Sequence, residues 1–200
     1  VNTTSVIVKF LKGLTILSSN IVIAGIDYSY TSPAICIFGG DFNTSHHYFL
    51  SGRKAIEKIS IPHNFHYHPM RKEYSCDEER WYYISKWAHH VLEINKVTHV
   101  NLEGYAYGSS AGQVFQIAEN TSLLKNMMWK MGIEFKIRAP ASLKKHYQGK
   151  GNAKKEQMGE HLLLSEGIDV VALLGMKSMG NPASDIIDAY ALSRMGLEDL

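Results

Sequence analysis

The chain has 200 residues, 45% hydrophobic and 20% charged, which is the balance of a globular domain with a sizeable core and excludes a disordered or fibrous protein. The net charge of +2 favours no class of partner, and no apolar run reaches the roughly 18 residues that a membrane span needs. Two cysteines, Cys36 and Cys76, are too few for a disulfide framework, so we expect a cytoplasmic protein. Cys36 lies in an apolar run and is expected to be buried.

Residues 6–17 are apolar but are interrupted by Lys9, Lys12 and Gly13. A secretory signal needs a stronger apolar stretch and a small-residue cleavage site. We therefore expect residues 1–20 to form an N-terminal extension, either an additional strand or a poorly ordered tail. It would precede a single domain over residues 21–200.

Short apolar runs rich in β-branched residues predict the strands of a sheet. Residues 21–28 and 34–38 are the first two, and a turn at Thr31-Ser32-Pro33 joins them. Further strands are expected over residues 46–50, 97–103 and 133–137. Residues 52–76, which contain Pro62 and Pro69, give no clear prediction.

The predicted helices follow from apolar residues at three- and four-residue spacing, clearest in residues 77–94. The other helices are expected over residues 110–131, 141–147, 153–165 and 182–196. This order predicts an α/β fold with a mixed five-stranded sheet, in which a three-strand meander is followed by two parallel strands. Helices would cover both faces, and the first strand would lie beside the fourth.

Four acidic residues are the candidate catalytic groups. Asp27 and Glu103 end two apolar strands, so their carboxylates would meet if these strands pair in register. Asp185 and Asp188 are three residues apart on one face of an apolar helix. Converging carboxylates repel one another until cations neutralise them, and their hard oxygen atoms favour Mg²⁺ or Mn²⁺. Two such ions form a clamp suited to phosphodiester hydrolysis. Each acid taken alone also fits a turn cap, a strand-end surface residue or a solvated helix face.

The sequence blocks around these acids resemble, in order, those of RuvC-type Holliday junction resolvases, which are crossover junction endodeoxyribonucleases of the ribonuclease-H-like superfamily. The blocks are Gly25-Ile26-Asp27, Leu102-Glu103-Gly104, residues 144–157 and Asp185-Ile186-Ile187-Asp188-Ala189. The most specific is LKKHYQGKGNAKKEQM, in which a lysine, a Gly-x-Gly turn and an x-Lys-x-Gln helix start follow one another. The resemblance covers residues 21–195 apart from 39–95.

The resemblance implies a ribonuclease-H-like fold, a homodimer and a four-way DNA junction as substrate. It also implies that Asp27, Glu103, Asp185 and Asp188 bind the metal ions. Lys155 matches the family lysine placed near the scissile phosphate, and Lys144 matches a second family lysine. For dimerisation we expect the surface of the helix over residues 110–131, which offers Met127, Met128 and Trp129.

A basic segment surrounds the third block. Residues 135–155 contain seven Lys or Arg and no Asp or Glu, which favours phosphate contact over an ordinary solvated surface. Lys144, Lys145, Lys150 and Lys154 are the candidate DNA-binding lysines. Tyr105 and Tyr107 could stack on exposed bases, although Ala106 occupies the position of the family's aromatic residue, and a buried tyrosine is an equal alternative.

The ten histidines lack a cysteine partner or an H-E-x-x-H pattern, so we expect contact with DNA or solvent in preference to zinc. Three functions remain open. The first is a junction resolvase, the second is a broader nuclease for branched or flapped DNA, and the third is a catalytically silent nucleic-acid-binding module of the same fold.

Overall fold

The computed structural model describes residues 21–105, 111–198 and 200, with side chains except at 111–113. The expected extension over residues 1–20 lies outside this range. The strands, in chain order, are β1 (Ile23–Asp27), β2 (Ala34–Ile37), β3 (His46–Ser51), β4 (Phe65–Pro69), β5 (His99–Glu103) and β6 (Glu134–Arg138). They form one sheet in the order β4-β3-β2-β1-β5-β6. The antiparallel meander β1-β2-β3 and the parallel strands β5 and β6 confirm the predicted mixed sheet.

The prediction of five strands was wrong, because β4 is a sixth strand that pairs in parallel with β3 at the edge of the sheet. Its sequence, FHYHP, has only one fully buried residue, Phe65, and ends in a proline. An edge strand tolerates a residue without an N–H donor, since one of its sides has no partner strand. A short run bounded by prolines therefore forms a strand only because β3 is available beside it.

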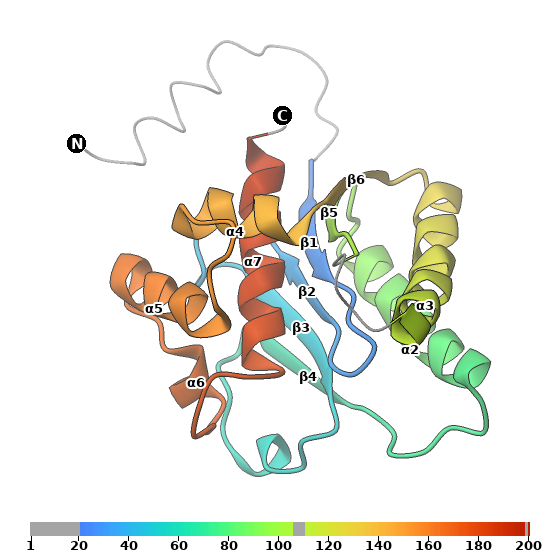
Figure 1. Cartoon of the computed structure of the whole chain (residues 1–200), viewed down its shortest axis with the longest axis horizontal. Helices are drawn as coiled ribbons and strands as arrows, with labels where there is room; N and C mark the ends of the chain where they lie inside the picture. The colour runs from blue at the N-terminus through green and yellow to red at the C-terminus, as the bar shows by residue number, and fades with distance from the viewer. Residues whose placement is uncertain (1–20, 106–110, 199) are drawn as a thin grey trace.

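Helices cover both faces of the sheet, as expected (Figure 1). Two of them, α2 (Asp77–Ile94) and α3 (Ala111–Lys130), lie on one face. Their buried side chains form a core with the side chains of β1, β2 and β5 that point to the same face. The other face is covered by α4 (Pro140–Gln148), α5 (Lys155–Glu166), the short α6 (Val170–Leu173) and α7 (Ala183–Leu197). A single 3₁₀ turn, η1 (Ile56–Lys58), precedes β4. None of these helices is long and apolar enough to cross a membrane.

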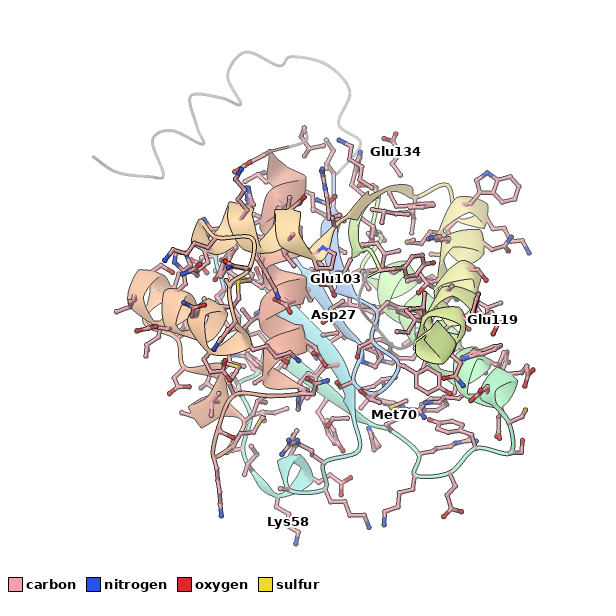
Figure 2. All side chains as sticks on the ribbon, viewed as in Figure 1. Asp27, Lys58, Met70, Glu103, Glu119 and Glu134 are labelled. Atoms are coloured by element: carbon pink, nitrogen blue, oxygen red, sulfur yellow. The ribbon has the colours of Figure 1, made fainter. Side chains whose placement is uncertain are left out.

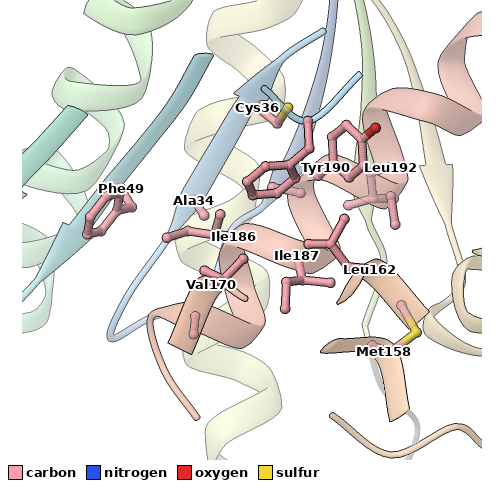
Figure 3. Close-up of a cluster of buried hydrophobic side chains, with 14 of the residues drawn as sticks. Ala34, Cys36, Phe49, Met158, Leu162, Val170, Ile186, Ile187, Tyr190 and Leu192 are labelled. Carbon is pink, nitrogen blue, oxygen red and sulfur yellow. The ribbon is translucent and has the colours of Figure 1, made fainter. Parts of the chain in front are cut away.

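The helix α7 is the centre of the second core (Figure 3). Its side chains Ile186, Ile187 and Tyr190 are each only 1% exposed and pack among residues of β2, β3 and α5. Cys36 belongs to this core and is fully buried, which confirms its expected role as a small hydrophobic residue. Such complete burial along one helix fixes its position against the sheet.

A glycine in β1 allows α7 to approach the sheet closely. A Cβ atom on Gly25 would lie 2.0 Å from the carbonyl oxygen of Ala189 and 2.3 Å from the amide nitrogen of Ser193. In the neighbouring strand, the side-chain amide of Asn101 donates a hydrogen bond to the carbonyl oxygen of Leu192 at 3.2 Å. These contacts hold the central turns of α7 against β1 and β5.

The sequence led us to expect that the histidines contact DNA or solvent. At least one of them, His47, does not. His47 is 1% exposed, its Nε2 atom lies 3.0 Å from the carbonyl oxygen of Phe42, and its ring stacks on the Phe42 ring at 4.1 Å. Burial lowers the pKa of His47 to about 4, so the ring is a neutral part of the core. The prediction was wrong at this position because alternation in β3 turns His47 inward and His46 outward.

Candidate active site

Two of the four acids meet at the ends of adjacent strands. Asp27 and Glu103 are the last residues of β1 and β5, and the parallel register pairs Ile26 with Leu102 just before them. The two carboxyl groups lie within hydrogen-bonding reach of each other. Figure 2 shows both residues near the centre of the molecule, where the strands end beside α7.

The other two acids come from the first turns of α7. Asp185 is 3% exposed and accepts hydrogen bonds from the hydroxyls of Ser32 and Ser184, the latter at 3.1 Å. Asp188 lies one turn further along the helix. A pocket of about 500 Å³ is lined by all four acids, which come from three segments distant in the sequence.

Burial and mutual repulsion disfavour four negative charges in this pocket. Burial raises the pKa of Asp27 well above its usual range, and the neighbouring carboxylates of Glu103, Asp185 and Asp188 raise it further. Burial, followed by repulsion from Asp185, raises the pKa of Glu103 to about 7. Burial and the charges of Glu103 and Asp185 raise the pKa of Asp188 to about 8. Burial also raises the pKa of Asp185, although the Ser32 hydroxyl opposes this shift.

Two lysines line the same pocket. Lys155 begins α5, and its ammonium group donates hydrogen bonds to the side-chain oxygen of Asn181 at 2.8 Å and to the hydroxyl of Ser184 at 3.1 Å. Lys144 reaches the pocket from α4. The positive charge of Lys155 lowers the pKa of Asp27 and of Glu103, so the lysine is close enough to interact with both acids.

Sequence reasoning missed the polar residues that hold these groups in place. Ser32, Asn181 and Ser184 contact the acids or the lysine, and Asn181 also lines the pocket. Serine and asparagine are common in turns and at helix starts, so no sequence signal distinguishes them from ordinary turn residues. Only their position beside Asp185 and Lys155 reveals their role.

The remaining DNA-binding candidates are placed differently. Lys145, Lys150 and Lys154 are exposed on α4 and the following loop, outside the pocket. Tyr105 lines the pocket, and its hydroxyl accepts a hydrogen bond from Lys125 at 3.2 Å. Tyr107 lies outside the described residues.

The donor set fits a divalent cation in its chemistry. It consists of carboxylate oxygens only, the hard ligands that Mg²⁺ and Mn²⁺ prefer, and a cation would relieve the repulsion among them. In the described part of the chain, no three Asp, Glu, His or Cys side chains are already placed as ligands of one ion. In this arrangement the carboxyl groups of Asp27 and Glu103 contact each other, and both oxygens of Asp185 accept hydrogen bonds from serine hydroxyls.

Comparison with known proteins shows which fold this is. No protein-family model matches the chain, and no curated protein matches it. Among solved structures, RuvC of Thermus thermophilus is 19% identical with a TM-score of 0.55, over 88% of this chain and 97% of that chain. The same protein in complex with Holliday junction substrate gives 18% identity and a TM-score of 0.57, over 87% of this chain and 91% of that chain.

The yeast mitochondrial Holliday junction resolvase Ydc2 is 12% identical with a TM-score of 0.53, and the match covers 96% of this chain and 84% of Ydc2. At such low identity the likeness establishes the fold and not the activity. The chain therefore has the ribonuclease-H-like fold of the RuvC-type resolvases, as its sequence blocks indicated.

Proposed function

We propose that the chain is a metal-dependent endonuclease that resolves four-way DNA junctions. The observation that carries the proposal is the single pocket in which four carboxylates from three distant segments face two lysines. One structural neighbour, Ydc2, is named as a Holliday junction resolvase, and another, RuvC, is in complex with Holliday junction substrate, which supports this choice of substrate.

In the proposed reaction, Asp27, Glu103, Asp185 and Asp188 would hold two Mg²⁺ or Mn²⁺ ions. When bound, such ions would supply the Lewis acidity that activates water and offsets negative charge on a phosphate group. The ammonium group of Lys155 faces the same phosphate and stabilises the negative charge that develops during hydrolysis.

The polar residues around the pocket keep its charged groups in position. Asn181 and Ser184 fix the ammonium group of Lys155 at a defined point of the pocket wall. Ser32 orients Asp185 through a hydrogen bond to its carboxylate. Such preorganisation lowers the barrier because little rearrangement is needed at the moment of reaction.

DNA binding is proposed for the exposed lysines next to the pocket. Lys145, Lys150 and Lys154 lie on α4 and the loop before α5, so they flank Lys144 and Lys155 inside the pocket. Phosphate contacts of this kind provide affinity without sequence preference. Tyr105, which lines the pocket, would touch a base or sugar of the bound strand.

A homodimer is proposed because two symmetric strands must be cut. Of the surface residues predicted on α3, Met128 is fully buried and cannot contribute, whereas Trp129 is 72% exposed. Phe115, which is 69% exposed, precedes Trp129 by close to four helical turns and lies on the same face. Sedimentation should show a dimer at micromolar concentration, and a strict monomer with and without DNA would contradict this part of the proposal.

The decisive experiment compares four labelled substrates on one gel. A four-way junction, a flap, a linear duplex and an RNA–DNA hybrid are each incubated with Mg²⁺, Mn²⁺ or EDTA. We expect cleavage of the junction with either ion and none in EDTA, and no cleavage by Glu103→Gln. Equal cleavage of flap and junction would favour a broader branched-DNA nuclease. Junction binding without cleavage under any condition would favour a catalytically silent binding module.

A further inference from the structure

A second, ring-lined groove lies on the other side of the sheet from the lysine-bearing helices. One face of α2 forms one wall, and residues of β3 and β4 form the other. Its volume is about 730 Å³, and it follows α2 from Glu79 to Ile94, which is about 22 Å of helix. The groove belongs to residues 39–95, which show no sequence resemblance to the resolvases.

Aromatic side chains dominate the groove. Tyr82, Tyr83 and Trp87 come from α2, and Tyr48 and His66 come from the strands, where their rings stack at 4.2 Å. Tyr82 is 62% exposed, so much of its ring surface is open to solvent. Flat, exposed rings with few aliphatic neighbours suit other flat ring systems better than they suit an apolar helix.

Positive charges lie against these rings. The guanidinium of Arg71 lies 5.2 Å from the centre of the Tyr83 ring, and the ammonium of Lys86 lies 5.8 Å from the Tyr82 ring. The one acid of the lining, Glu79, is bound by Arg71 at 3.0 Å and by the hydroxyl of Ser75 at 2.9 Å. The groove therefore offers ring faces and cations together, which is the pattern that binds bases and phosphates.

A series of ring and guanidinium contacts connects the groove with the acidic pocket. Tyr30 lines the acidic pocket, and the guanidinium of Arg80 lies 3.9 Å from its ring centre. Arg80 also lies 5.5 Å from the ring of Tyr74, which in turn lies 5.9 Å from Tyr83 in the groove. These contacts link the acidic pocket to the groove through neighbouring side chains.

We propose that this groove binds a single-stranded segment of nucleic acid, with bases stacked on Tyr82, Tyr83 and Trp87 and phosphates near Lys86. Duplex DNA does not expose base faces, so the groove would select unpaired strands, such as those that open where arms of a branched substrate meet. Only the suggestion that the unpaired strand belongs to a branched substrate rests on the proposed nuclease function. Binding to a single strand can be measured without any cleavage.

The test uses fluorescence anisotropy of labelled oligo-dT of about 12 nucleotides with the full chain in EDTA. The groove variant is Tyr82→Ala combined with Lys86→Ala, two exposed residues whose truncation should leave the fold intact. The control variant is Leu164→Ala combined with Lys58→Ala, which removes an exposed apolar side chain and one positive charge outside the groove.

We expect the groove variant to bind oligo-dT about tenfold more weakly than the unmodified chain, and a linear duplex less than about twofold more weakly. The control variant should match the unmodified chain. Oligo-dT should also quench tryptophan fluorescence, and Trp87→Phe should remove most of that quenching. Retention of full oligo-dT affinity by the groove variant, or an equal loss in the control, would overturn the proposal. A chain that cleaves no junction but shows the expected binding pattern would contradict only the nuclease function.

Discussion

Replacing Asp188 by asparagine should make the metal-free protein more stable, even though it removes a catalytic group. In the folded chain Asp188 faces two carboxyl groups, Glu103 and Asp185, and two ammonium groups, Lys144 and Lys155, on α4 and α5. Burial and the two carboxylates outweigh the lysines and raise the pKa of Asp188 from 3.8 to about 8. Asparagine keeps the size of the side chain and cannot ionise.

The size of the effect follows from the linkage between pKa and stability. A raised pKa in the folded state means that the neutral acid is favoured there, so the contribution of Asp188 to stability is greatest below pH 4. That contribution then falls as the pH rises from 3.8 toward about 8. Between pH 3.8 and pH 7 the lost free energy of unfolding amounts to about 4 kcal/mol, at 1.36 kcal/mol per pH unit. The titration of Glu103 and Asp185 is coupled to that of Asp188, so removal of its charge also reduces the repulsion on these two acids. We therefore expect Asp188→Asn to raise the free energy of unfolding by about 2 to 4 kcal/mol.

The assay is urea unfolding in EDTA at pH 5 and pH 8, followed by circular dichroism. The advantage of Asp188→Asn over the unmodified chain should be larger at pH 8 than at pH 5. Addition of Mg²⁺ at pH 8 should stabilise the unmodified chain and reduce that advantage, because the cation neutralises the same charges. The control is Glu119→Gln, which neutralises an exposed acid of α3 that does not line the pocket (Figure 2).

Two results would refute this reasoning. If Asp188→Asn is less stable than the unmodified chain at pH 8 in EDTA, the acid is stabilised by its lysine neighbours and the pocket is not dominated by repulsion. If Asp188→Asn and Glu119→Gln change stability by the same amount at both pH values, the effect reflects net charge and not the pocket.

Three further predictions concern the site and its support. Lys155→Ala should lower the cleavage rate at least about 100-fold with little loss of junction affinity, and equal losses in rate and binding assays would assign the lysine to binding only. Asp27→Asn should abolish cleavage yet bind junctions in EDTA as well as the unmodified chain, in preference to duplex; Mg²⁺-dependent nicking by the folded variant would remove Asp27 from the metal site. Gly25→Ala should destabilise the fold by more than about 3 kcal/mol, because its Cβ would lie 2.0 Å from the carbonyl oxygen of Ala189. The control is Gly52→Ala, which has open space around it and should leave the thermal melt almost unchanged.

Much of the fold could be read from local patterns. The helix over residues 77–94 was predicted with the bounds that the structure has, because its apolar side chains recur at helical spacing. The three strands of the meander and the two parallel strands were recognised as short apolar runs. The edge strand β4 was missed because its hydrogen bonds come from β3, about 20 residues earlier, and nothing within FHYHP requires a strand.

The sequence by itself determined the chemical types of the candidate site: carboxylates at two strand ends, two more on one helix face, and lysines in a basic segment. Their spacing could not determine distance, because Asp27 and Asp185 are far apart along the chain. Tertiary structure decided that they share one pocket, through the register of β1 with β5 and the close approach of α7 at Gly25. It also decided which neighbours hold them, since a serine becomes a hydrogen-bond donor to Asp185 only when packing places the two side chains in contact.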